Sequence, residues 1–114
     1  MIATFLQFQV ALRLYHWNTK VYSRHLASGN LYQTLDGMID EFVEVASGQR
    51  VSVGISDPVQ FKLSRPPKDA EMVILLKQFG GFLENLRVRS VDLKNLRDSM
   101  LSEVNRTLYL FRLH

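Results

Sequence analysis

The strongest constraint on the fold is a single long interruption in an otherwise helical pattern. Four segments carry apolar residues at the three- and four-residue spacing of an α-helix, and only the stretch from Ser47 to Lys68 breaks that pattern for long. Within it, Pro58 and the Pro66-Pro67 pair prevent a sustained helix. Four helices with a long connection only between the second and third predict an all-α, four-helix bundle with one crossover, the topology of ferritin-like folds.

The first segment, from Ile2 to about Asn18, contains neither glycine nor proline and has apolar residues on two faces. One apolar stripe consists of Phe5, Phe8, Leu12 and Tyr15. The other consists of Ala3, Leu6, Val10, Leu14 and Trp17. We therefore expect this helix to be covered on one face by its own domain and on the other by a partner subunit.

The other helices have recognisable ends. The second carries Leu31, Leu35, Met38, Phe42 and Val45 on one face and is predicted to stop at Gly48. Its start is open, because Ser28-Gly29-Asn30 suits either a turn or a cap. Asp69 is predicted to cap the third helix and Ser90 the fourth. The pair Gly80-Gly81 predicts a kink or a close neighbour within the third helix.

Length and composition limit the possible functions. The chain of 114 residues predicts one domain over residues 1–114. It has no cysteine, which excludes disulfides, thiolate metal sites and cysteine nucleophiles. The net charge of +3 comes from scattered basic residues, so we expect DNA binding to be absent or weak. No apolar stretch is long enough to span a bilayer, which predicts a soluble intracellular protein.

The only chemical pattern combines acidic residues and histidines. Asp36, Asp40 and Glu44 follow one another at four-residue spacing, so they lie along one side of the second helix, roughly 6 Å apart. A solvated acidic stripe is one interpretation. The other is a cation site, since apolar residues flank Asp40 and Glu44 and carboxylates in a bundle need neutralising. His16 and His25 bracket the first connection, and imidazole with carboxylate suits iron, manganese or zinc.

These residues resemble the Dps proteins, the miniature ferritins of the ferritin-like family. The run His16-Trp17-Asn18-Thr19-Lys20 is similar to the motif with which their pattern begins. A second histidine follows after a short loop, with an Asp fifteen residues beyond it and a Glu four further on. His25, Asp40 and Glu44 match that register without a gap. Similarity over the rest of the chain is at the level of helical pattern.

The resemblance implies a hollow shell of twelve subunits that binds Fe(II) at two-fold interfaces, oxidises it, typically with hydrogen peroxide, and stores it as a mineral. It implies that His16 and His25 are ligands from one subunit and Asp40 and Glu44 from its partner, with Trp17 beside the site. Gly29 stands where the family carries another Asp, so the ligand set is incomplete. Asp36 is a possible additional ligand. The basic N-terminal tail that some members use on DNA is missing.

Two functions therefore stay open. The first is a Dps-like protein with iron, or another divalent metal, at a subunit interface and ferroxidase activity. The alternative is a bundle without bound metal or that activity, acting as a structural or interaction subunit of a larger assembly such as a viral particle. Arg13 is relevant to the choice, because an ion pair with Asp40 or Glu44 would make the acidic residues structural.

Overall fold

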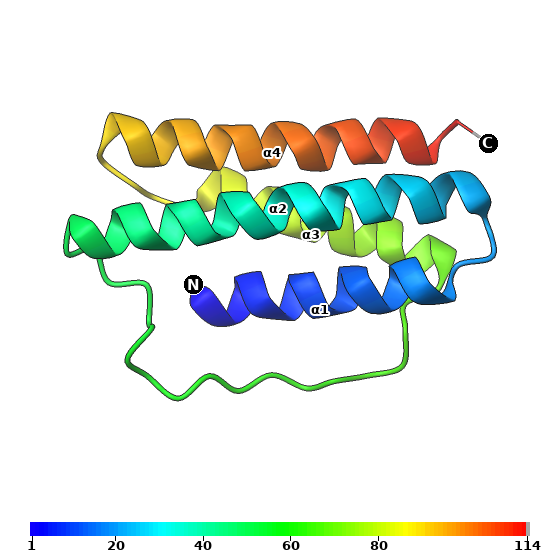
Figure 1. Ribbon diagram of the computed structural model, residues 1–114, viewed down its shortest axis with the longest axis horizontal. Helices are drawn as coiled ribbons and strands as arrows, with labels where there is room; N and C mark the ends of the chain where they lie inside the picture. The colour runs from blue at the N-terminus through cyan, green and yellow to red at the C-terminus, as the bar shows by residue number, and fades with distance from the viewer. Residues whose placement is uncertain (114) are drawn as a thin grey trace.

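The fold is a bundle of four α-helices, confirming the predicted all-α architecture (Figure 1). The computed structural model describes residues 1–113, among which there is no strand. His114, to which the sequence assigned no role, lies outside the described residues. The four helices are α1 (Ile2–Asn18), α2 (Tyr22–Gly48), α3 (Asp69–Asn85) and α4 (Val91–Phe111).

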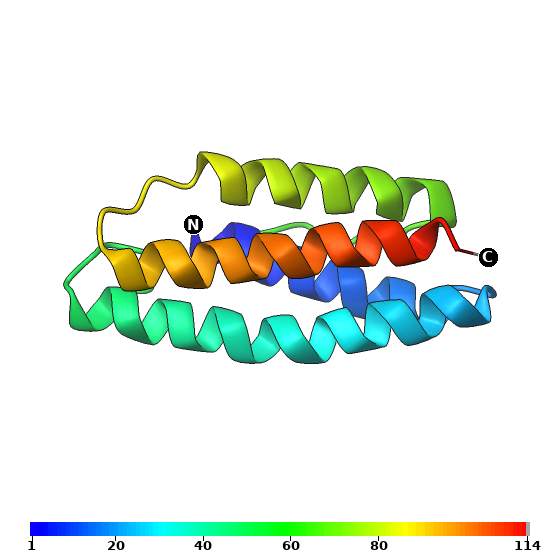
Figure 2. The ribbon, with the colours of Figure 1, turned by 90° about the horizontal axis from the view of Figure 1, so that it is seen from above.

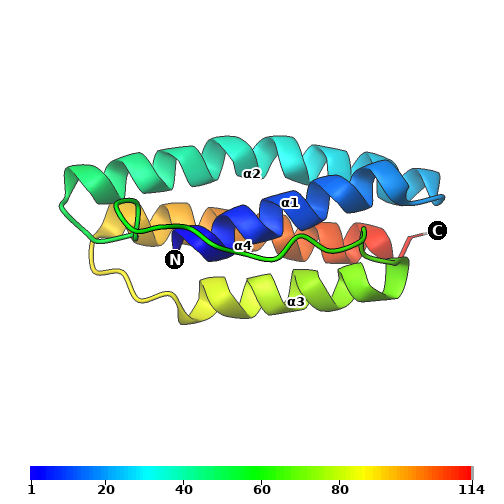
Figure 3. The same ribbon diagram turned by 90° about the horizontal axis from the view of Figure 1, so that it is seen from below.

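The connections fix the order in which the helices pack. Residues 19–21 join α1 to α2 as an antiparallel pair, and a short connection does the same for α3 and α4. The crossover, residues 49–68, returns the chain to the other end of the bundle, so α2 and α3 run parallel (Figures 1 and 3). α2 packs against both α1 and α4, and α3 packs against α4, as the view in Figure 2 also shows. The contact between α1 and α3 is the smallest of the four, so this seam is the open side of the bundle.

The core forms around the first apolar stripe of α1. All four of its residues are buried, as predicted: Phe5, Phe8, Leu12 and Tyr15. The Phe5 ring makes edge contacts with three other phenylalanines, with centroid distances of 5.7 Å to Phe42, 6.1 Å to Phe79 and 5.5 Å to Phe82. The second stripe lies outside this core, and Leu6 and Trp17 are 37% and 66% exposed.

Two predicted helix ends are confirmed and one is wrong. α2 ends at Gly48, and the Ser90 hydroxyl accepts a hydrogen bond of 3.4 Å from the Leu93 amide at the start of α4. Asp69 does not cap α3: it is the first helical residue, and Lys68 occupies the cap position. The carboxylate of Asp69 is instead used in contacts with α1, and Glu71 accepts the Lys68 amide at 3.0 Å.

The glycines singled out in the sequence lie within continuous helices. Ser28-Gly29-Asn30 is neither a turn nor a cap, because α2 runs through it without a break. A Cβ at Gly80 would be 3.6 Å from the Leu101 side chain and 3.7 Å from that of Val104, which are ordinary packing distances, so α4 packs on α3 there without requiring a glycine. No helix among the described residues is long and apolar enough to cross a membrane.

Asp69 ties three helices together at one end of the bundle. Its carboxylate accepts hydrogen bonds from the Tyr15 hydroxyl at 2.7 Å and the Thr19 hydroxyl at 2.9 Å. Arg24 donates to the Asp69 carbonyl at 3.0 Å and to the Phe111 carbonyl at 3.3 Å. The Tyr15 hydrogen bond is the main reason that the pKa of Asp69 is lowered, while burial raises the pKa of Tyr15.

We predict that Asp69→Ala lowers the free energy of unfolding by about 1–3 kcal/mol at neutral pH, because the buried Tyr15 hydroxyl loses its acceptor. A carboxyl whose pKa is lowered by folding stabilises the native state above the ordinary Asp value of about 3.9. That contribution disappears as pH falls through the lowered pKa of the folded state. Urea unfolding of wild type and variant should therefore converge in acid, and a pH-independent difference would contradict the assignment. Asp57→Ala, on the exposed crossover, is the control.

Candidate metal site

The two histidines of the sequence motif lie against each other at the α1–α2 turn. His16 is in the last turn of α1 and His25 in the first turns of α2. Their rings are stacked nearly parallel, with centroids 4.0 Å apart and planes inclined by 14°. Both side chains are half-buried, and the Tyr22 ring stacks beyond His25 at 6.4 Å. The turn of residues 19–21 is what brings the two residues into contact.

Each histidine is held by the backbone of the other. Nδ1 of His16 lies 2.8 Å from the carbonyl oxygen of His25, and Nδ1 of His25 lies 2.8 Å from the carbonyl oxygen of His16. A carbonyl oxygen can only accept, so both Nδ1 atoms carry a proton. In the neutral rings, both Nε2 atoms then hold a free lone pair. No hydrogen bond among the described residues uses either Nε2, which is the arrangement that metal-binding histidines adopt.

Gly29 makes room for the His16 ring. A Cβ at position 29 would lie 2.7 Å from Cε1 of His16, closer than such atoms pack, and 3.1 Å from its Nδ1, which is also tight. This glycine lies within α2, where it costs about 1 kcal/mol relative to alanine. By the family resemblance, a carboxylate is missing at position 29. In the structure, a side chain at this position would displace the His16 ring. The sequence feature that could have indicated this packing role is the position of Gly29, one helical turn after His25.

Ser28 also supports the pair, a role that no pattern in the sequence indicates. Its side chain is fully buried, and its hydroxyl donates to the His25 carbonyl at 3.2 Å. The same oxygen lies 3.3 Å from Nδ1 of His16. The His25 carbonyl is thus fixed by both neighbours, so the orientation of the His16 ring is set before any ligand binds.

The predicted acidic residues lie along α2, exposed to solvent. Asp36, Asp40 and Glu44 are all exposed in the single chain. The apolar residues next to Asp40 and Glu44 in the sequence therefore do not bury these two carboxylates within one subunit. Hydrogen bonding and like-charge repulsion from Asp40, with a smaller contribution from Glu41, raise the pKa of Glu44. Asp36 accepts a hydrogen bond of 2.6 Å from the Gln9 amide on α1. None of the ion pairs among residues 1–113 involves Asp40 or Glu44.

The structure does not bring the histidines and the carboxylates together within one chain. His25 and Asp40 are fifteen residues apart on the same helix, a separation of about 22 Å. Among residues 1–113 there is no group of three or more acidic or histidine side chains that could hold a metal ion. A site containing both halves would need a second subunit.

Arg13 does not form the ion pair that the sequence left open. Its guanidinium lies over the Tyr32 ring at 4.2 Å and near the Trp17 ring at 6.0 Å. It is thus held by aromatic faces rather than by Asp40 or Glu44. Trp17, Tyr22 and Leu26 are 66%, 70% and 49% exposed, so residues close in sequence to the two histidines present apolar surface to solvent.

These features define a class of protein: an all-α bundle with two preorganised imidazoles at one end of a helix pair and carboxylates further along it. The model of a family of unknown function, DUF5856, matches residues 16–111, and the chain belongs to that family. The match begins at His16 and includes all four predicted ligands. No curated protein and no solved structure matches the chain.

We predict opposite effects for two glycine substitutions in α2. Gly29→Ala should displace the His16 ring and break its bond to the His25 carbonyl, lowering stability. Gly37→Ala, with nothing within 4 Å of its added Cβ, should raise the free energy of unfolding by about 0.4–1 kcal/mol. Imidazole nitrogen NMR should show Nδ1–H tautomers for both histidines in wild type and Gly37→Ala. An unchanged His16 signal in Gly29→Ala would refute the packing role.

Proposed function

We propose that this chain is a divergent Dps-like protein that binds Fe(II) between two subunits, oxidises it and stores it. The observation that carries the proposal is the histidine pair, whose Nδ1 atoms are both used by backbone carbonyls. Imidazoles that donate their Nδ1–H groups to backbone carbonyls keep their Nε2 lone pairs for a metal ion when the rings are neutral. Fe(II) is the substrate and cargo in this proposal, together with a peroxide oxidant.

A two-fold axis is the simplest way to join the two halves. In an isologous contact, residue i of one subunit faces residue j of the other, and j faces i. An antiparallel α2–α2 contact that sets His25 opposite Asp40 of the partner subunit has its axis between Tyr32 and Gln33. The same register forms both sites at once, one at each end of the contact.

The exposed surface supports that arrangement. Trp17, Tyr22 and Leu26, close in sequence to the two histidines, would be removed from water in the dimer. The acidic residues lie on the exposed side of α2. A cation bound between the carboxylates of Asp40 and Glu44 would offset the repulsion that contributes, after their hydrogen bond, to the raised pKa of Glu44.

The register also gives Asp36 a role. With His25 opposite Asp40, Gly29 of one subunit faces Asp36 of the partner subunit. The carboxylate absent at position 29 would then be supplied across the interface, next to the His16 ring for which Gly29 makes room. In the single chain this carboxylate is held by Gln9, which fixes it on the α1–α2 surface.

The histidine and carboxylate ligands would hold the iron in place and stabilise its charge. Imidazole nitrogen and carboxylate oxygen together suit Fe(II), and the negative carboxylates favour the more highly charged Fe(III). Each oxidation balances when two Fe(II) ions give one electron each to one hydrogen peroxide. Its O–O bond breaks, and with two protons its oxygens leave as two water molecules. Protons released at hydrolysis of Fe(III) return to solvent.

A second candidate function is a structural or interaction subunit of a larger assembly, for example a viral particle. The observation favouring it is the same exposed apolar surface around Trp17, Tyr22 and Leu26, which suits a flat contact with another protein. In that case the stacked histidines serve to fix the α1–α2 turn and bind no metal.

We predict that Asp40→Asn combined with Glu44→Gln abolishes peroxide-dependent Fe(II) oxidation and leaves helical content unchanged, because both residues are exposed. The matched control is Asp57→Asn with Glu84→Gln, which removes the same charge from exposed positions elsewhere. Oxidation followed by absorbance should be lost only in the first variant. Equal rates in both would remove Asp40 and Glu44 from the site.

A mixing experiment tests the shared interface itself. His16→Ala with His25→Ala should be inactive, as should the carboxylate variant. Randomly reassociated dimers of the two are half mixed, and each mixed dimer regains one intact site of its two, so about a quarter of the wild-type activity should return. No recovery after verified subunit exchange would contradict a site built from both subunits.

A further inference from the structure

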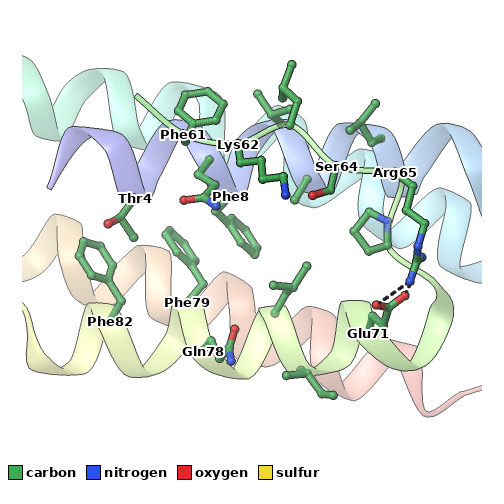
Figure 4. Close-up of a pocket in the computed structure, with 18 residues that line it drawn as sticks. Thr4, Phe8, Phe61, Lys62, Ser64, Arg65, Glu71, Gln78, Phe79 and Phe82 are labelled. Carbon is green, nitrogen blue, oxygen red and sulfur yellow. Dashed lines mark hydrogen bonds and ion pairs between the residues drawn. The ribbon is translucent and has the colours of Figure 1, made fainter. Parts of the chain in front are cut away.

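The open seam between α1 and α3 contains an apolar groove. It has a volume of about 680 Å³ and is bordered by α1, by α3 and by the end of the crossover that passes over it (Figure 4). Its apolar lining includes Phe8, Val10, Leu14, Leu75, Phe79 and Phe82. Phe8 and Phe79 stack face to face at 4.0 Å and form the floor. Volume and lining are those of a small-molecule site rather than of a packing defect.

The groove is elongated along α1 and α3. Its lining on α1 extends from Thr4 to Leu14, ten residues and therefore about 15 Å of helix. On α3 it extends from Glu71 to Phe82. Val10 and Leu14 belong to the second apolar stripe of α1, which the chain's own core leaves uncovered. An extended apolar chain lying between the two helices would cover them.

One free positive charge lies at the edge of this groove. Lys62, on the crossover, extends toward the groove, and no ion pair or hydrogen bond among the described residues uses its ammonium group (Figure 4). Arg65, the other cation there, is neutralised by two contacts with Glu71 at 3.0 Å and 3.2 Å. The occupant should therefore carry a single negative charge at one end of an apolar body.

We propose that this groove binds a medium-chain fatty acid, with its hydrocarbon chain between α1 and α3 and its carboxylate at Lys62. Apolar area and one cation match the two parts of such a molecule. The inference does not depend on metal binding, since the histidines lie at the α1–α2 turn and do not line the groove.

Binding of dodecanoate to the full-length chain tests the proposal, measured by displacement of a dansyl-labelled fatty acid. Wild type should bind saturably, and Lys62→Glu should weaken binding by about 1.4-fold to fivefold, the range for an exposed charge pair. Lys77→Glu, an exposed α3 lysine outside the groove, is the matched control and should bind as wild type does. Dodecanol should bind wild type and Lys62→Glu equally.

Ala11→Trp fills the groove from α1 and should reduce dodecanoate binding at least tenfold. Circular dichroism checks that this variant is folded; the two lysine variants change only exposed side chains. Absence of saturable binding to wild type, or equal weakening by Lys62→Glu and Lys77→Glu, would overturn the proposal. The proposal would also be overturned if Ala11→Trp changed the number of subunits without affecting dodecanoate binding, because the occupant would then be a second copy of this chain.

Discussion

The reciprocal hydrogen bonds between His16 and His25 are the interaction on which the candidate site depends. Two 2.8 Å bonds close the α1–α2 turn, and each takes the Nδ1 proton of one ring and the backbone carbonyl of the other. They satisfy carbonyls at the end of one helix and near the start of the next. Because both Nδ1 atoms are occupied, the same bonds fix the tautomer and leave Nε2 as the unprotonated nitrogen of each neutral ring. The same two hydrogen bonds therefore stabilise the turn and hold both imidazoles in place for a ligand.

Much of the fold could be predicted from apolar spacing. The buried stripe of Phe5, Phe8, Leu12 and Tyr15 follows directly from the period of a helix, and the proline-rich crossover fixes the connection order. Asp69 shows the limit of such reasoning. Its type and position suit a cap, but a buried tyrosine hydroxyl fifty-four residues away in sequence competes for its carboxylate. Tertiary hydrogen bonds of this kind leave no local pattern.

The candidate site, like the fold, could be predicted only in part from the sequence. His16, His25, Asp40 and Glu44 could be named from their spacing, yet the structure places the histidines in contact and leaves Asp40 about 22 Å away along α2, with Glu44 one turn further on. The support from Ser28 and the space made by Gly29 depend on how α1 crosses α2, which no single-helix pattern contains. The exposed carboxylates and the exposed aromatic residues both indicate an α1–α2 surface that is incomplete in one chain.

The most direct measurement is an anaerobic Fe(II) titration of the purified chain with native mass recorded at each step. The proposed account predicts saturable binding of about one ion per subunit, confined to species with an even number of subunits, because each site needs two chains. Addition of peroxide should then oxidise the bound iron. Binding no stronger than in a buffer control, or equal binding by isolated monomers, would contradict a site shared between subunits.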